Sequence, residues 1–133
     1  MIDVENEVVD EVVTRLREVY DPIYIYSEPQ SIPAGYPAVV MREMSNVVRE
    51  RNIDSGGIEN YAVLMYQVSV YSNLRQGKKA QAKAIRNLVD TVMGEMGFVR
   101  TFSQPIENLY DTNITRYESR YEAATDGEYF YRR

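Results

Sequence analysis

Apolar residues recur at helical spacing in two stretches of the chain. The first stretch repeats mostly at steps of three and four, which predicts one buried face of a helix; its members are Val9, Val12, Val13, Leu16 and Tyr20. Asp3 is the expected N-cap. Asp21 and Pro22 should end this helix, because a residue before proline avoids the α region.

The second helical stretch covers residues 78–96. Its predicted buried stripe consists of Ala82, Ile85, Leu88, Val89, Val92 and Met96. Gly97 follows directly and is a typical C-terminal stop.

Between and after these helices, the pattern changes to the alternation of strands. Residues 61–72 give the strongest signal, with Leu64, Tyr66, Val68 and Val70 on one face that should meet the core. The remaining predicted strands are residues 23–26, 38–41 with an extension toward 47, 98–102, 114–124 and 128–132. Gln104 and Pro105 are expected to form a turn, and residues 49–60 a polar excursion between strands.

The predicted order is therefore α-β-β-β-α-β-β-β in a single domain, residues 1–133. Two amphipathic helices should cover one face of a mostly antiparallel or mixed β-sheet, which is an α+β fold.

Composition excludes several kinds of chemistry. The chain has no Cys and no His, which removes disulfides, thiolate metal sites, imidazole acid–base catalysis and the Ser–His–Asp triad. A net charge of -5 argues against a dedicated DNA-binding domain. Neither a signal peptide nor a membrane-spanning run is visible, so we expect a soluble protein. Because both His and Cys are missing, we also expect no catalytic residues, no metal ligands and no cofactor.

One strand carries a row of alternating charges, Arg116, Glu118, Arg120 and Glu122. A solvated sheet face with cross-strand ion pairs is one interpretation, and a contact between subunits or a lumen surface is another. Catalysis fits less well, because the arginines should keep both carboxylates ionised.

The polar excursion is a second candidate surface. We interpret it as a loop that docks on a partner protein, with Arg49, Arg51, Asp54, Ser55, Gly56 and Gly57 as candidate contacts. Its residues 54–57 lack the alternating acids of a calcium loop. The Gly-Lys pair at 77 and 78 lacks the first glycine and the Ser or Thr of a phosphate-binding loop.

Several segments resemble the small tail-completion or tail-terminator proteins of long-tailed (siphovirus-type) bacteriophages and prophages. They are residues 36–40 (YPAVV), 66–86 (YQVSVYSNLRQGKKAQAKAIR), 97–101 (GFVRT), 105–109 (PIENL) and 114–123 (ITRYESRYEA). The resemblance spans residues 36 to 132. It consists of the order of the elements and of similar short segments rather than of one diagnostic motif.

The resemblance implies a non-enzymatic structural protein of the virion, assembled in the host bacterial cytoplasm. Such proteins form homo-oligomeric rings, commonly of six subunits, that end tail-tube polymerisation and join the tail to the head. Implied partners are the tail-tube protein and head connector proteins, with DNA as transient cargo in the lumen and no membrane. The alternatives are a head-completion or connector protein of the neck, or a small ligand-binding or enzymatic α+β domain.

Overall fold

The predicted element order is confirmed in the computed structural model, which describes residues 1–28, 33–49, 61–107, 113–126 and 130–131. The elements are α1 (Glu5–Val19), β1 (Tyr24–Tyr26), β2 (Ala38–Arg49), β3 (Tyr61–Ser72), α2 (Lys78–Glu95), β4 (Val99–Ile106), β5 (Thr115–Thr125) and β6 (Phe130–Tyr131). Neither described helix combines the length and hydropathy that a membrane-spanning segment needs.

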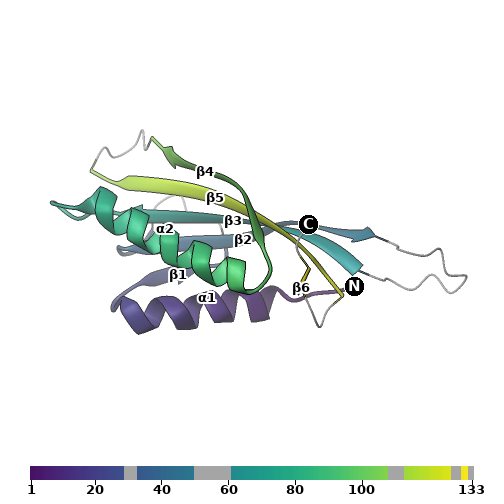
Figure 1. Cartoon of the computed structure of the whole chain (residues 1–133). Helices are drawn as coiled ribbons and strands as arrows, with labels where there is room; N and C mark the ends of the chain where they lie inside the picture. The colour runs from purple at the N-terminus through teal and green to yellow at the C-terminus, as the bar shows by residue number, and fades with distance from the viewer. Residues whose placement is uncertain (29–32, 50–60, 108–112, 127–129, 132–133) are drawn as a thin grey trace, which may run out of the picture.

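The strands form one mixed sheet in the order β1-β2-β3-β5-β4, with β6 paired to the end of β5. β1 runs parallel to β2, and the other pairs are antiparallel. Both helices lie on the same face of this sheet (Figure 1). The described part of the chain therefore has two layers, one of helices and one of strands.

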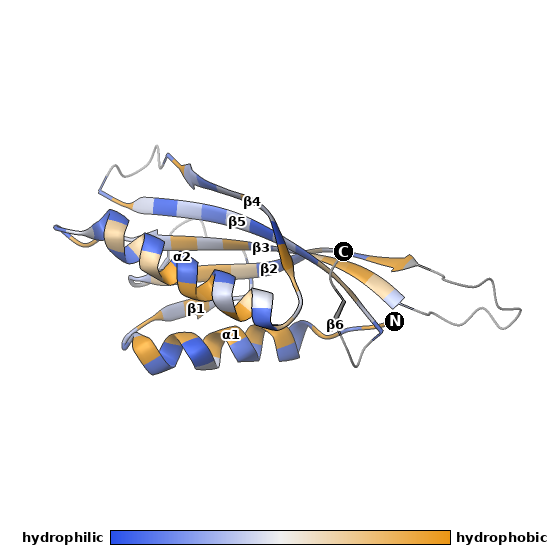
Figure 2. Cartoon of the chain, in the orientation of Figure 1, coloured by the Kyte–Doolittle hydropathy of each residue, from blue (hydrophilic) through white to orange (hydrophobic). Residues whose placement is uncertain are grey.

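The main core lies between these two layers. A smaller apolar cluster lies on the other face of the sheet, where Ala38, Val40 and Tyr71 are buried. The predicted face of β3 is buried in the main core, with Leu64, Tyr66, Val68 and Val70 at most 1% exposed. The Tyr66 ring meets Phe98 edge to face, at a centroid distance of 5.4 Å. Apolar residues gather where the helices meet the sheet, and polar residues follow their outer sides (Figure 2).

Several sequence expectations need correction. On α1, Val8 is fully buried although it was not predicted, whereas the predicted Val9 and Val13 are half-buried. Asp3 does not cap α1, which begins after Val4, although its carboxylate accepts a hydrogen bond from the backbone N–H of Glu5 at 3.2 Å. Met93, not predicted, is fully buried on α2. Pro105 lies inside β4 rather than in a turn, because β4 is an edge strand and an edge position needs no backbone N–H from proline.

Two glycines of α2 should respond to alanine with opposite signs. Gly77 caps the helix with a φ of 81°, so Gly77→Ala should lower the free energy of unfolding by about 1 kcal/mol. Gly94 lies in the last turn, where an added Cβ meets nothing within 4 Å, so Gly94→Ala should raise it by about 0.5 kcal/mol. Urea unfolding followed by circular dichroism measures both, and changes of equal sign would contradict this account of the helix ends.

Candidate functional site

The sheet face that points away from both helices carries the predicted charged row, and we call it the open face. Tyr117 and Tyr121 of β5 point into the core, so strand alternation places Arg116, Glu118 and Arg120 on the open face. Glu122 is the next residue of β5 on this face, and it pairs with Met65 of β3 and Val99 of β4. The structure thus gathers all four residues on one surface.

Open-face side chains are more buried than a solvated sheet face would be. Glu118 is 9% exposed, Gln67 8% and Ser69 4%, although no described helix covers them. A cross-strand row runs from Arg42 of β2 through Gln67 to Arg120 and Phe102 of β4. Within it, Nε and Nη2 of Arg42 donate to Oε1 of Gln67 at 3.1 and 2.8 Å. The long side chains therefore lie along the sheet and cover its polar groups.

Both arginines of β5 lie over aromatic rings. The guanidinium carbon of Arg116 is 5.3 Å from the centroid of Tyr71, and that of Arg120 is 5.3 Å from the centroid of Phe102. Between described residues, neither guanidinium has a carboxylate oxygen within 4.0 Å. Among the described residues, Arg116 and Arg120 form no cross-strand ion pair, because the register sets them opposite Tyr71, Ile106, Gln67 and Phe102 rather than opposite acids.

The same arginines each hold a buried N–H group without an acceptor. The Nε atoms of Arg116 and Arg120 are shielded from water and have no hydrogen-bond partner in the described structure. Nη2 of Arg116 reaches Oγ of Ser69, but at 3.4 Å. An unsatisfied buried donor costs about 1 to 3 kcal/mol, and such groups in a folded protein call for a reason.

The second predicted surface falls largely outside the described residues. Arg51, Asp54, Ser55, Gly56 and Gly57 belong to the segment 50–60, and Arg49 is the last residue of β2, with its side chain not described. The described ends of β2 and β3 run past both helices (Figure 1). Val47 and Val48 are 42% and 48% exposed there, one on each face of the sheet, because consecutive strand residues point to opposite sides.

Two tyrosine–carboxylate pairs lie on the helix-covered side of the sheet. The Tyr66 hydroxyl donates to Oε1 of Glu43 at 3.2 Å, and the Tyr121 hydroxyl donates to Oδ1 of Asp90 at 3.1 Å. Burial, reinforced by the neighbouring carboxylate, raises the pKa of each tyrosine above its usual range. Both phenols therefore stay protonated near neutral pH and serve as hydrogen-bond donors rather than as bases.

Glu43 should make stability depend on pH. Burial raises its pKa above the ordinary 4.5, the carboxylates of Glu5 and Asp3 raise it further, and the Tyr66 hydrogen bond opposes them. The folded state therefore holds this proton longer than the unfolded state, and its stability falls as pH rises from 4.5 through the folded pKa.

Glu43→Gln keeps an oxygen that can accept from Tyr66 and removes the charge. We expect the Tm to rise by about 2 °C at pH 7 and to change little below pH 4.5, where the native carboxyl is also neutral. Thermal melts at both pH values check this. An equal rise at the two pH values would show that the charge of Glu43 is not the cause.

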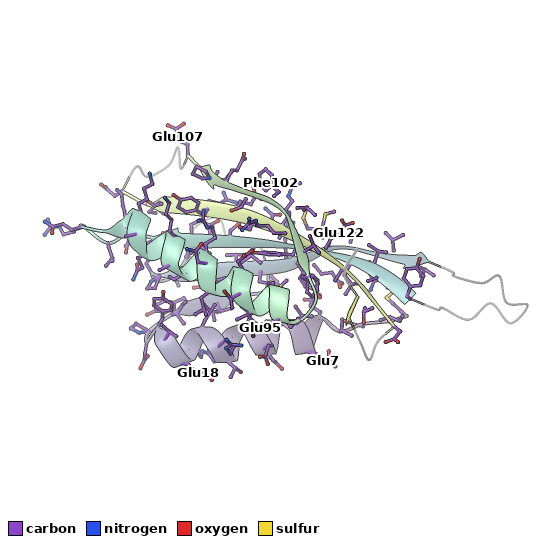
Figure 3. The ribbon with its side chains drawn as sticks, in the orientation of Figure 1. Glu7, Glu18, Glu95, Phe102, Glu107 and Glu122 are labelled. Atoms are coloured by element: carbon purple, nitrogen blue, oxygen red, sulfur yellow. The ribbon has the colours of Figure 1, made fainter. Side chains whose placement is uncertain are left out.

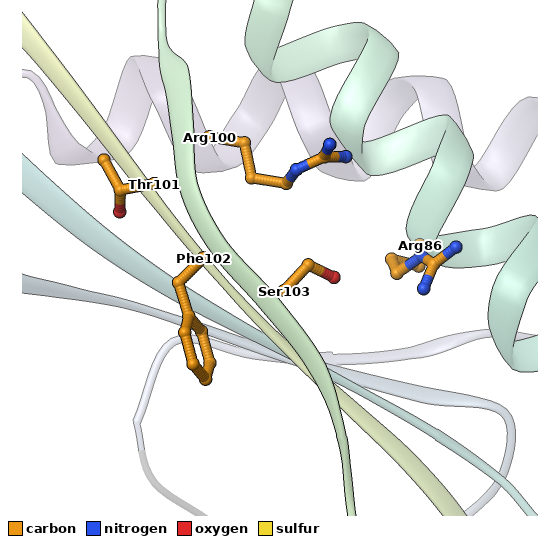
Figure 4. Close-up of a pocket in the computed structure, with 5 residues that line it drawn as sticks. All are labelled: Arg86, Arg100, Thr101, Phe102 and Ser103. Carbon is orange, nitrogen blue, oxygen red and sulfur yellow. The ribbon is translucent and has the colours of Figure 1, made fainter.

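A groove that the sequence did not predict separates α2 from β4. This open groove has a volume of about 490 Å³ and is lined by Arg86, Arg100, Thr101, Phe102 and Ser103. The Arg86, Arg100 and Ser103 side chains point into it, whereas those of Thr101 and Phe102 turn to the other side of β4 (Figure 4). Nη1 of Arg100 pairs with Oδ1 of Asp90 at 3.2 Å, and the Arg86 guanidinium lies 4.9 Å from the Tyr117 ring centroid.

In the described part of the chain, no group of three or more acidic side chains is placed to hold a metal ion. No protein-family model matches this sequence, and no curated protein matches it closely enough to count as a relative.

Proposed function

We propose that this chain is the subunit of a closed homo-oligomeric ring, of six copies in the simplest case, at the head-proximal end of a phage tail. The ring would end tail-tube polymerisation and present the surface to which the head connector joins. The observation that carries the proposal is the open face, which no described helix covers and where the Nε–H groups of two arginines are buried without acceptors. A neighbouring chain that packs there would cover the second face and offer acceptors to the Nη groups of these two arginines.

The two ends of the sheet also suit a ring. One end is the three-residue strand β1 beside β2, and the other is the eight-residue edge strand β4. A closed ring forms when two unlike surfaces of the same protomer meet head to tail. In the proposed ring, the β4 end of one copy is held by the β1 end of the next, which reaches the open face at Arg116 and Arg120.

The remaining features fit the other contacts of such a ring. A net charge of -5 disfavours adhesion of DNA to a passage that it must cross. The exposed Val47 and Val48 offer one apolar side chain on each face of the sheet to the tail-tube or connector protein, next to the docking segment proposed from the sequence. In this proposal the chain has no catalytic role.

Negative-stain electron microscopy of the purified protein tests the proposal. The expected class averages are rings with a central opening and one rotational symmetry, six-fold in the simplest case. Compact particles without an opening, at every concentration, would contradict it. A head-completion or connector protein of the neck would also form rings. Those rings would bind a connector protein but would leave tail-tube growth unchanged in a co-assembly assay.

A further inference from the structure

Two surfaces of the helix layer carry opposite charge. The outer side of α1 exposes four carboxylates and one arginine, and we call it the acidic face: Glu7, Asp10, Glu11, Glu18 and Arg17. Within it, Oε1 of Glu11 also lies 4.0 Å from Nη1 of Arg15. Glu7 and Glu18 are labelled at the outer side of α1 (Figure 3). Acidic residues are expected on a chain of net charge -5, so this face alone indicates no ligand.

The opposite charge gathers beside the groove between α2 and β4. Lys79, Lys83 and Arg86 follow one another at helical spacing on α2, and Arg100 joins them from β4. We call these four residues the basic flank. Lys79 and Lys83 are exposed, and Asp90 is the carboxylate that the structure places against Arg100. The chain has a net negative charge, so this flank is a local patch of positive charge.

The two surfaces cannot neutralise each other within one chain. Arg15 and Glu95 occupy the boundary between the helices, with Nη1 of Arg15 2.6 Å from Oε2 of Glu95. The basic flank lies on the far side of α2, because Arg86 and Asp90 point toward β4 while Glu95 points toward α1. The charges can therefore meet only between different molecules.

We infer that the acidic face of α1 docks onto the basic flank and groove of a second copy of this chain. The inference rests on the proposed ring and names its head-to-tail contact. Each copy presents one acidic face and one basic flank, so the contact is heterologous and can close into a ring. The groove beside β4 gives the incoming acidic side chains space, and Arg86, which has no carboxylate within 4.0 Å in the described structure, gains one there.

Two charge-reversal variants test the contact by light scattering at low salt. The first replaces Asp10, Glu11 and Glu18 with lysine, and it leaves Glu7 in the first turn of α1, where an acid favours the helix. The second replaces Lys79, Lys83 and Arg86 with glutamate. We expect each variant alone to self-associate at least about 100-fold more weakly than the native chain, because like charges then face each other. An equal mixture of the two should regain assembly, since each supplies the charge that the other lacks.

The outcomes separate this contact from the ring itself. If the native chain assembles and either variant assembles equally well, the contact is wrong, and the proposed ring must form through another surface. A mixture that stays dissociated would overturn it as well. A native chain that remains monomeric throughout would overturn both proposals. Binding of labelled duplex DNA that the glutamate variant loses, without any change in self-association, would assign the basic flank to nucleic acid instead.

Discussion

Replacing Arg116 and Arg120 together with glutamate should weaken self-association by at least about 100-fold while the chain stays folded. Both side chains lie on the open face, over Tyr71 and Phe102, at the margin where the proposed neighbour packs. Reversing their charge places carboxylates where the neighbour is expected to offer acceptors. Sedimentation velocity over a range of concentrations measures the loss.

Replacing the same two arginines with methionine separates assembly from stability. Methionine keeps apolar contact with the rings and removes the two buried Nε–H groups that have no acceptor, so the isolated chain should gain about 1 to 2 kcal/mol in free energy of unfolding. Arg75→Glu, in the exposed turn before α2, is the matched control and should change neither property. Unchanged assembly of the double glutamate variant would show that the open face is not a contact between copies.

Leu64→Ala should cost about 3 to 4 kcal/mol in free energy of unfolding. Leu64 is fully buried in the central strand β3, in the core cluster beneath the helices. A single domain has roughly 5 to 15 kcal/mol of stability, so this one change removes a large share of it.

The matched control is Leu74→Ala, the same truncation at a residue that is 43% exposed in the turn after β3. Its expected cost is below about 0.5 kcal/mol. Urea unfolding followed by circular dichroism compares the two variants. Similar costs for Leu64 and Leu74 would contradict the placement of β3 at the centre of the core.

The parts of the fold with strong periodicity could be predicted from the sequence. One face of β3 is apolar from Leu64 to Val70, and the apolar stripe of α2 repeats over four turns, so the hydrophobic pattern alone indicates both elements and the faces that they bury. Pro105 could not be placed, because whether a strand tolerates proline depends on its position in the sheet. Edge position results from pairing between β4 and β5, which local sequence does not report.

The candidate surface could be predicted only in part. Alternation placed Arg116, Glu118, Arg120 and Glu122 on one face, and the structure agrees. Their partners could not be predicted, because the register between β3, β5 and β4 decides that Tyr71 and Phe102 lie beneath the arginines. The groove between α2 and β4 could not be predicted either, because Arg86 and Arg100 are brought together only when the helix packs on the sheet.

The central claim is that copies of this chain assemble into a closed ring, and solution mass tests it most directly. Light scattering after size exclusion should give a mass that rises with protein concentration and then stays constant at a whole multiple of 15.4 kDa, six-fold in the simplest case. A limiting value means that a closed assembly has formed. A mass of one chain at every concentration, or a mass that grows without limit, would contradict the account.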